Sequence, residues 1–259
     1  QRVGVPWLGW TCGTCRYCRE GQENLCENAR FTGYHLNGGF ADYCVVDARF
    51  CFPLNQNSGL SDLNLAPLLC AGLIGYRAFR MAVNTNGTDS TQTIGFYGFG
   101  SAARILLQLV RHENCDVYAI TRTGDVERQK VARRLGAIWA GGSDEDMPAV
   151  LDAAIIFAPT GPLVPIALKA VRKGGSVICA GIHMSDIPSF PYEYLWGERI
   201  IRSVANLTRK DGEEFLKRAA EIPIKPTVVS YLLKDINAAL DDLRRGRIDG
   251  TGVIDLQAD

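Results

Sequence analysis

Short apolar stretches alternate with amphipathic ones along the chain from residue 93 onward. Short apolar runs predict buried strands, and apolar positions that recur every three to four residues predict helices. The expected strands are 93–97, 116–121, 137–140, 151–159, 176–182, 199–205 and 251–256. The expected helices are 101–112, 125–137, 161–175, 209–221 and 235–246, with Gly174 and Gly175 ending the third. This alternation predicts an α/β fold with a doubly wound parallel (Rossmann) sheet.

The first ten residues, "QRVGVPWLGW", read as a strand that is entered partway, because no turn precedes their alternating apolar positions. The first residue is Gln1 and not Met. We therefore expect the chain to be a fragment or a processed form.

Composition and charge exclude several classes of function. The 259 residues include 28 basic and 28 acidic side chains. The sequence therefore lacks the excess of basic residues that would predict nucleic-acid binding. The apolar runs are too short to span a membrane, and the N-terminus has no signal-peptide pattern. We expect a cytoplasmic protein that acts on a small molecule.

Four of the nine cysteines, Cys12, Cys15, Cys18 and Cys26, form a C-x2-C-x2-C-x7-C pattern. Two-residue gaps let a tight turn direct two sulfur atoms at one zinc ion, at about 2.3 Å. Four thiolates complete a tetrahedron and leave no open position, so the pattern predicts a structural zinc site. A pair of disulfides or free thiols is the alternative.

The charge of four thiolates around one zinc ion needs compensation. Arg16, Arg19 and Arg30 are expected to offset it and to hydrogen-bond the sulfur atoms. The cysteines outside the cluster that lie in apolar or strand-like surroundings are expected to be small buried hydrophobic residues. They are Cys44, Cys51, Cys115 and Cys179.

A glycine motif, G-x-G-x-x-A, lies between the expected strand 93–97 and the helix that follows. This position within a βαβ unit is typical of dinucleotide-binding turns. Gly98 permits the tight turn, Gly100 lets the backbone approach a pyrophosphate, and Ala103 keeps helix and strand close. Ser101 and Ala102 open the helix, whose N-terminus favours the negative charge.

The end of the next strand bears on the choice of cofactor. NAD binding favours an Asp or Glu about 20 residues after the glycines, whereas this chain has Thr121 and Arg122. A hydroxyl and a guanidinium suit a 2′-phosphate, so we expect NADP rather than NAD, with Arg128 assisting. The alternative is that Arg122 is a solvated surface residue.

A four-cysteine lobe that precedes a dinucleotide fold resembles the zinc-dependent alcohol dehydrogenases of the medium-chain dehydrogenase/reductase superfamily. The segments that carry the resemblance are "RVGVPWLGWTCGTCRYCREGQENLC", "FTGYHLNGGFADYCVV", "APLLCAGLIGYRAFR", "YGFGSAA" and "CAGI". The second resembles a family strand, with Asp42 where Glu is usual. The family's G-R-x-V-L motif is Gly250–Ile254 here and lacks its Arg, which puts that phosphate contact in doubt.

The resemblance implies three regions. Residues 1–74 are expected to be part of a GroES-like, β-rich catalytic domain, with the zinc lobe at about 10–30. Residues 75–206 are expected to be the dinucleotide-binding domain, and 207–259 the return to the catalytic domain. The backbone of Gly181 and Ile182 is expected to meet the nicotinamide.

Cys70 is expected, from the resemblance, to be a ligand of a catalytic zinc. Without the resemblance, a buried structural thiol is the better interpretation. The family's other two ligands and its proton-relaying Thr or Ser lie upstream of the segments present, so this chain is expected to lack a complete catalytic site and to show negligible alcohol oxidation by itself. Of the three histidines, His112 is expected to be a surface cap of a helix, and His35 a plain loop residue. His183 is equally well a loop residue or a neighbour of the cleft.

Two hypotheses of function remain open at this stage. The first is an oxidoreductase in which zinc activates an alcohol and a hydride passes between an alcohol/aldehyde pair and NAD(P). The second is a non-catalytic NAD(P)-binding fragment or module with a structural zinc. The resemblance also implies a homodimer or homotetramer, with the aromatic segment 188–204 as a contact.

Overall fold

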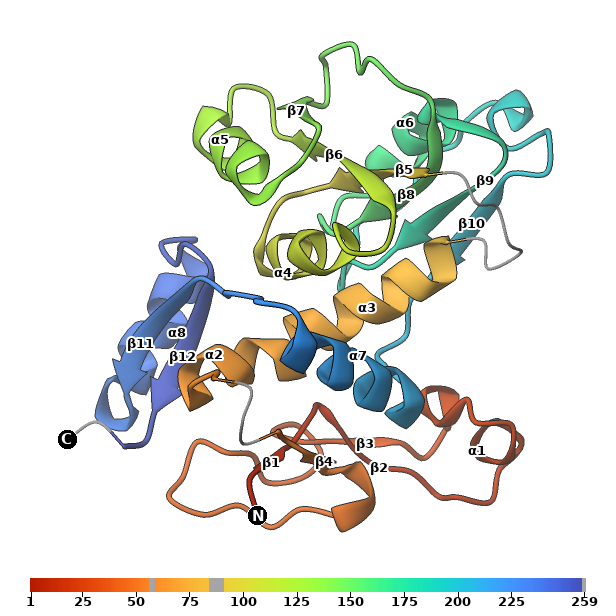
Figure 1. The fold of residues 1–259 in the computed structure, drawn as a ribbon. Helices are drawn as coiled ribbons and strands as arrows, with labels where there is room; N and C mark the ends of the chain where they lie inside the picture. The colour runs from red at the N-terminus through yellow and green to blue at the C-terminus, as the bar shows by residue number, and fades with distance from the viewer. Residues whose placement is uncertain (56–58, 84–90, 258–259) are drawn as a thin grey trace. The chain divides into compact units, whose positions relative to one another are not determined.

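The computed structural model describes residues 1–55, 59–83 and 91–257. These residues form two compact units, one made of 1–73 with 205–259 and the other of 74–204 (Figure 1). The sequence placed the boundaries at 74/75 and 206/207. Within the described residues, no helix combines the length and the apolar character that crossing a bilayer requires.

The second unit is built on a six-stranded parallel sheet in the order β10-β9-β8-β5-β6-β7. Its strands are β5 Gln92–Tyr97, β6 Cys115–Thr121, β7 Trp139–Gly142, β8 Leu151–Ile156, β9 Val171–Cys179 and β10 Ile200–Ser203. Its helices are α3 Ala71–Ala82 (which begins in the first unit), α4 Ser101–Val110, α5 Val126–Leu135 and α6 Leu163–Ala170. The doubly wound parallel sheet predicted from the sequence is confirmed.

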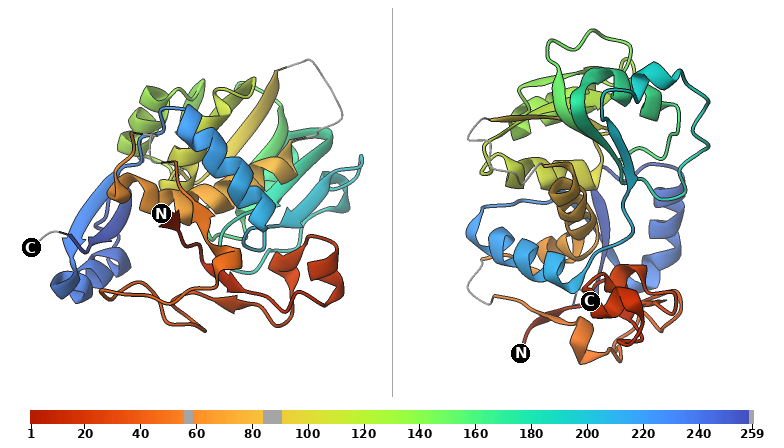
Figure 2. Two further views of the ribbon diagram at one scale, coloured as in Figure 1. Left: turned by 60° about the horizontal axis from the view of Figure 1, so that its bottom comes forward. Right: turned by 90° about the vertical axis from the view of Figure 1, so that its right-hand side faces the viewer.

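Helices cover both faces of this sheet (Figures 1 and 2). The helix α4 contacts α5, and α5 contacts β6 and β7, whereas α6 contacts β5, β8 and β9. The central strands β5 and β8 are mainly apolar, because most of their residues are buried on both faces of the sheet. Ile94, Phe96 and Ile155 are fully buried, and Tyr97, Ile120 and Val164 belong to the core beneath α6.

The first unit contains short strands and the chain's last two helices. They are β1 Val3–Gly4, β2 Leu8–Trp10, β3 Arg30–Phe31, β4 Phe52–Pro53, α1 Arg16–Arg19, α2 Asp62–Leu65, α7 Arg209–Glu221, β11 Val228–Leu232, α8 Ile236–Arg244 and β12 Thr251–Asp255. The 3-10 turns of the chain are η1 Glu23–Leu25, η2 Ala48–Phe50, η3 Ala66–Leu69, η4 Tyr192–Tyr194 and η5 Leu233–Asp235. The strands β11 and β12 are parallel neighbours.

The helix α7 has the bounds that its pattern predicts, and a capping box explains where it begins. The Thr208 hydroxyl accepts from the Asp211 backbone N–H, and the Asp211 carboxylate accepts from the Thr208 backbone N–H. Both residues are buried, so this pairing satisfies donors that water cannot reach. The apolar face of the helix buries Phe215, Leu216 and Ala219.

Three expected elements differ in the structure. The helix expected over 161–175 ends at Ala170, and Gly174 and Gly175 lie inside β9. There the register of β9 against β8 shifts, and a Cβ at Gly175 would come within 2.8 Å of the Asp152 carbonyl oxygen. Gly175 thus serves close strand packing, whereas Gly174 has φ +72°, in the left-handed region. The strand expected over the first ten residues is divided into β1 and β2.

The strand that the resemblance implied at "GGFADYCVV" is an irregular segment instead. Its side chains Phe40, Tyr43 and Val45 are 63%, 92% and 94% exposed. No described strand pairs with this segment, and an extended backbone without a partner gains no ladder hydrogen bonds. Cys44 lies in it and is exposed, so the expectation that it is buried is wrong.

Candidate metal centre and cofactor site

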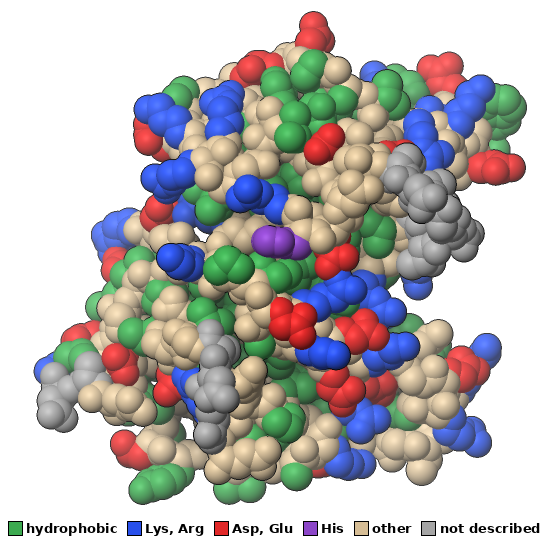
Figure 3. Space-filling model, in the orientation of Figure 1, with side chains coloured by type: hydrophobic (Ala, Val, Ile, Leu, Met, Phe, Trp, Pro, Cys, Tyr) green, Lys and Arg blue, Asp and Glu red, His purple; other side chains and the backbone are tan. Residues whose placement is uncertain are grey.

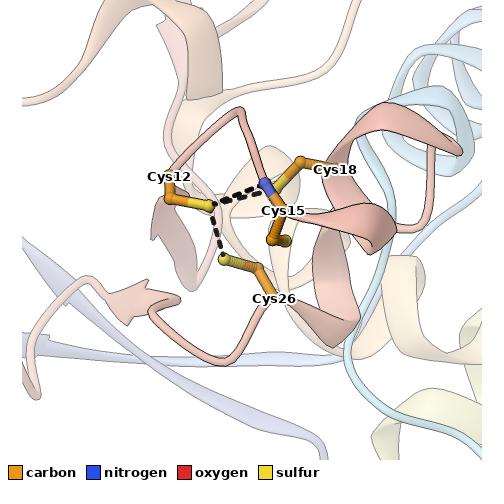
Figure 4. Close-up of side chains that lie close together, drawn as sticks. All are labelled: Cys12, Cys15, Cys18 and Cys26. Atoms are coloured by element: carbon orange, nitrogen blue, oxygen red, sulfur yellow. Dashed lines mark hydrogen bonds between the residues drawn. The ribbon is translucent and has the colours of Figure 1, made fainter.

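The four clustered cysteines converge on one point (Figure 4). Cys12 follows β2, Cys15 is the N-cap residue of α1, Cys18 lies within α1, and Cys26 follows η1. Their sulfur atoms all lie within 4.8 Å of one another, and none is in a disulfide. Among the described residues this is the one group of three or more potential metal ligands.

The spacing of the sulfur atoms fits a tetrahedral zinc site. With zinc–sulfur bonds of about 2.3 Å, tetrahedral geometry separates the sulfur atoms by about 3.8 Å. The Cys12 sulfur lies 3.9 Å from that of Cys18 and 3.6 Å from that of Cys26. The residues present therefore fit the ion, and all four positions of a tetrahedron are taken by protein, as in a structural site.

Backbone groups, and not the expected arginines, contact these sulfur atoms. The Cys15 N–H donates to the Cys12 sulfur at 3.3 Å. Hydrogen bonds from the backbone at Thr14 and Cys15 lower the pKa of the Cys12 thiol to about 6. Arg16 instead pairs with Glu20, and the Arg30 guanidinium lies over the Trp10 ring.

Two further residues, which the sequence analysis did not single out, link the zinc lobe to the start of α7. The buried Glu23 carboxylate accepts from the backbone N–H of Arg209 at 2.8 Å and from its guanidinium at 3.2 Å. The Asn24 amide donates to the Ala205 carbonyl oxygen at 2.6 Å. The sequence signal for these residues was their position between the metal ligands Cys18 and Cys26. Polar side chains that are buried at such a position need hydrogen-bond partners.

The glycine motif forms a tight turn between β5 and α4. Gly98 has φ +91°, in the left-handed region, and a Cβ there would come within 2.9 Å of the Ala158 nitrogen. Gly100 is the N-cap residue of α4 and has no atom within 4 Å of the position that a Cβ would occupy. No side chain caps this helix, so its first N–H groups can serve an anion. Ala103 is fully buried.

The carboxyl ends of neighbouring strands frame this turn. Gly181 and Ile182 follow the end of β9, and the Gly181 N–H donates to the Ile156 carbonyl at the end of β8. Ile182 is 63% exposed. His183, with φ +54°, follows at this edge. His112 lies exposed just beyond α4, and His35 lies in an exposed loop with its ring tilted by 33° against that of Phe31.

The residues expected at the ribose end of the cofactor divide into two groups. Thr121 is 5% exposed, and its hydroxyl contacts the carbonyl oxygens of Arg122 and Gly141 and accepts from the Gln129 amide. The hydroxyl of Thr121 points inward, and its bonds fix the end of β6. Arg122 is exposed, and its carbonyl oxygen accepts from the Thr121 hydroxyl and the Asp125 N–H, whereas its guanidinium forms no hydrogen bond or ion pair with a described residue and only contributes to lowering the pKa of Asp125.

Arg128 has a partner already. Its guanidinium pairs with the Asp125 carboxylate, which caps α5 by accepting from the Arg128 backbone N–H. Partial burial raises the pKa of Asp125, but the hydrogen bonds from Arg128 outweigh it and the net shift is downward. The expected help from Arg128 toward a 2′-phosphate would therefore require it to leave Asp125.

Cys70 stands apart from the four-cysteine cluster. It ends the 3-10 turn η3 immediately before α3 and is exposed, so it is not the buried structural thiol that composition alone favoured. Surrounding protein nevertheless raises the pKa of its thiol by desolvation. In the described part of the chain it does not join two other potential ligands.

Comparison with known proteins decides the family. A probable alcohol dehydrogenase named AdhA from Mycobacterium tuberculosis is 44% identical over 256 residues, which cover 98% of this chain and 71% of that protein. An alcohol dehydrogenase from Geobacillus stearothermophilus is 32% identical, over all of this chain and 76% of its own length. The chain belongs to the zinc-dependent alcohol dehydrogenases of the medium-chain superfamily.

Three further matches support the fold. Residues 1–56 match the family described as the alcohol dehydrogenase GroES-like domain. The Helicobacter pylori protein called CAD, solved with NADP(H), superposes with a TM-score of 0.84 at 24% identity, over 99% of this chain and 75% of that one. Acetophenone reductase from Geotrichum candidum, solved with NAD, gives the same score over 97% and 72%.

Proposed function

We propose that this protein transfers a hydride between an alcohol/aldehyde pair and a nicotinamide dinucleotide, with NADP as the preferred cofactor. The observation that carries the cofactor part is the open backbone at Gly100, at the uncapped start of α4. The relatives' names support the alcohol part. The alternative is a module that binds the cofactor without catalysis. The open backbone at Gly100 supports it equally well, but the relatives' names do not.

In this proposal each group has a limited task. The N–H groups at the start of α4 hold the pyrophosphate, and the backbone at Gly181 and Ile182 orients the nicotinamide. The cluster of four cysteines holds a structural zinc and takes no part in the chemistry. Cys70 would provide one thiolate to a second zinc, which would supply a Lewis acid for the alcohol oxygen.

Arg122 is the residue proposed to distinguish the two cofactors. Its guanidinium is exposed at the end of β6 and, within the described residues, has no competing ion pair. A charge-assisted contact to a 2′-phosphate contributes about 1.5–3 kcal/mol, or about ten- to a hundredfold in affinity, with solvent exposure favouring the lower end.

Titration of NADPH and NADH against Arg122→Ala tests this assignment. The variant should lose about tenfold in NADPH affinity and keep its NADH affinity, because only the 2′-phosphate contact is removed. Lys130→Ala is the matched control, since Lys130 is an exposed cation on α5 that pairs with Glu127. Equal affinities of the wild type for both cofactors would replace the NADP assignment with NAD.

Turnover tests the catalytic part, and it is measured on a protein that joins this chain to the upstream segment on which the resemblance places the other two zinc ligands, because the chain by itself is expected to show negligible turnover. Cys70→Ser should abolish aldehyde reduction while cofactor affinity and the structural zinc persist. Cys44→Ser, which changes another exposed thiol, should leave turnover unchanged. A wild type that binds NADPH but reduces none of a broad panel of aldehydes and ketones would favour the non-catalytic module.

Self-association is also part of the proposal. The segment 188–204 exposes Tyr192, Trp196 and Ile200 by 71%, 59% and 53%, next to the edge strand β10. An unpaired strand edge with exposed apolar side chains favours pairing with a second copy. Light scattering should give the mass of a dimer or a tetramer, and Ile200→Lys should reduce it.

A further inference from the structure

The connection from β7 to β8 leaves part of the sheet without a helix. It comprises only residues 143–150 and contains no helix, whereas a crossover between parallel strands usually includes one. A right-handed crossover at this point runs on the same face as α6. Since α6 contacts β5, β8 and β9, the portions of β6 and β7 on that face have no helix over them in the described structure.

A groove of about 450 Å³ occupies this position, a size that suits a small organic molecule. Its floor is formed by Tyr97, Ile120 and Trp139, from three adjacent strands. Its walls are formed by Gly142 at the end of β7, by residues 143, 145–147, 149 and 150 of the connection, and by Ile166, Lys169 and Ala170 of α6. Figure 3 shows hydrophobic side chains with acidic ones beside them over this region of the unit.

The aromatic part of the floor is held in place by its own strand. The Trp139 ring lies so close to the backbone that a Cβ at Gly141 would come within 2.2 Å of it. Tyr118 supports the same ring from the next strand, with ring centroids 6.5 Å apart. The indole is half-buried, and a flat ligand can stack on such a surface.

The Tyr97 side chain places a polar group at this groove. Tyr97 is 2% exposed as a residue and lines the groove, and its hydroxyl is not one of the buried polar atoms that lack a partner, so the oxygen is open to the groove. Burial raises the pKa of Tyr97 to about 12, so the phenol stays protonated and can both donate and accept. A polar atom of a ligand in the groove can therefore form a hydrogen bond with this hydroxyl.

The charged residues at the rim of the groove favour one sign of charge on the ligand. Glu145 and Asp146 are exposed carboxylates on the connection, and Glu145 is oriented by the Gly142 N–H at 2.7 Å. Lys169, the one cation of the lining, lies with its ammonium 4.4 Å from the centroid of the Tyr194 ring. Two carboxylates beside an aromatic floor favour a cation.

We propose that this groove binds a small aromatic amine as its cation, with the ring on Trp139, a polar ring atom at the Tyr97 hydroxyl and the ammonium group near Glu145 and Asp146. The groove includes none of the residues 98–103 of the phosphate turn. It is therefore a second ligand site on the dinucleotide-binding unit, separate from the proposed site for the cofactor.

Calorimetric titration with two probes that share one ring tests the proposal. Tryptamine is a cation at neutral pH and indole-3-acetate is an anion, so the groove should bind tryptamine at least about fivefold more tightly. Glu145→Gln combined with Asp146→Asn should remove most of that difference while keeping the acceptor that Gly142 needs. Saturating NADPH should not displace tryptamine by competition.

Variants of two tyrosines separate the groove from general packing. Tyr97→Phe keeps the ring and removes the hydroxyl, so tryptamine affinity should fall about three- to tenfold. Tyr118→Phe is the matched control, because Tyr118 supports Trp139 but does not line the groove. Equal binding of both probes, no tryptamine binding at millimolar concentration, an unchanged affinity in Tyr97→Phe, or competition by NADPH would each overturn the proposal.

Discussion

The two glycines of the phosphate turn should respond to the same substitution in opposite ways. Gly98→Ala places a Cβ on a residue with φ +91°, at 2.9 Å from the Ala158 nitrogen and 3.0 Å from its Cβ. Gly100→Ala adds the same methyl group to a residue with φ −91° and ψ −161°, where no atom lies within 4 Å. The methyl group of Gly98→Ala clashes with the protein itself, whereas the methyl group of Gly100→Ala would clash with a bound ligand.

The magnitudes follow from these contacts. A left-handed conformation costs a non-glycine residue about 1–2 kcal/mol, and overpacking against fixed backbone adds about 1–3 kcal/mol. Gly98→Ala should therefore lose about 2–5 kcal/mol of stability, a fall in Tm of about 4–20 °C. Gly100→Ala changes an N-cap from Gly to Ala, which costs about 0.5–1 kcal/mol.

Gly100→Ala, which should change stability little, should strongly reduce cofactor affinity. The methyl group of Gly100→Ala occupies the space through which a pyrophosphate approaches the backbone, so NADPH affinity should fall at least about tenfold while the protein stays folded. Thermal unfolding by circular dichroism and NADPH titration by fluorescence measure the two effects. Normal NADPH binding by Gly100→Ala would show that the pyrophosphate lies elsewhere, and a wild-type Tm for Gly98→Ala would refute the strain argument.

Three further predictions concern other parts of the molecule. Elemental analysis should find one structural zinc held by the cluster; Cys15→Ser should lose it and unfold the lobe, because metal binding there is folding energy, whereas Cys44→Ser should retain it. Thr208→Ala should cost about 1–2 kcal/mol, measured by urea unfolding, since a buried cap is lost; an unchanged midpoint would contradict the capping role. Hydrogen bonds from Tyr231 and Arg247 lower the pKa of Asp242. The contribution of Asp242 to stability is therefore present above its pKa in the unfolded chain and is lost as pH falls through the lower pKa of the folded protein. Asp242→Asn should reduce the loss of stability in acid, and a variant with the same pH profile of stability as the wild type would contradict this.

The sequence predicted those features that depend on local spacing. The bounds of α7 and the order of strands and helices follow from apolar periodicity, because one buried face per element is a local property. The four cysteines converge because their ligand atoms lie within a single short segment. The turn at Gly98 was predictable because its chemistry needs one backbone conformation.

Features that depend on distant partners were missed or misplaced. Gly174 and Gly175 resemble a helix end, but their surroundings are set by β8 and by the Asp152 carbonyl. The hydroxyl of Thr121 turned inward because Gln129 and Gly141 bond it. The groove over Trp139 depends on the β7–β8 connection, which contains no helix and leaves the sheet face open.

The bonds between the zinc lobe and α7 join residues that are made at very different times. Asn24 and its acceptor Ala205 are 181 residues apart, and Glu23 and Arg209 are 186 apart. At a synthesis rate of about 5–20 residues per second, Arg209 emerges about 9–37 s after Glu23. The four cysteines span only residues 12–26, so a ribosome-bound chain can complete the metal site long before α7 exists. Zinc captured early would protect the nascent thiols from oxidation and mispairing, and it would preserve the surface on which α7 later docks.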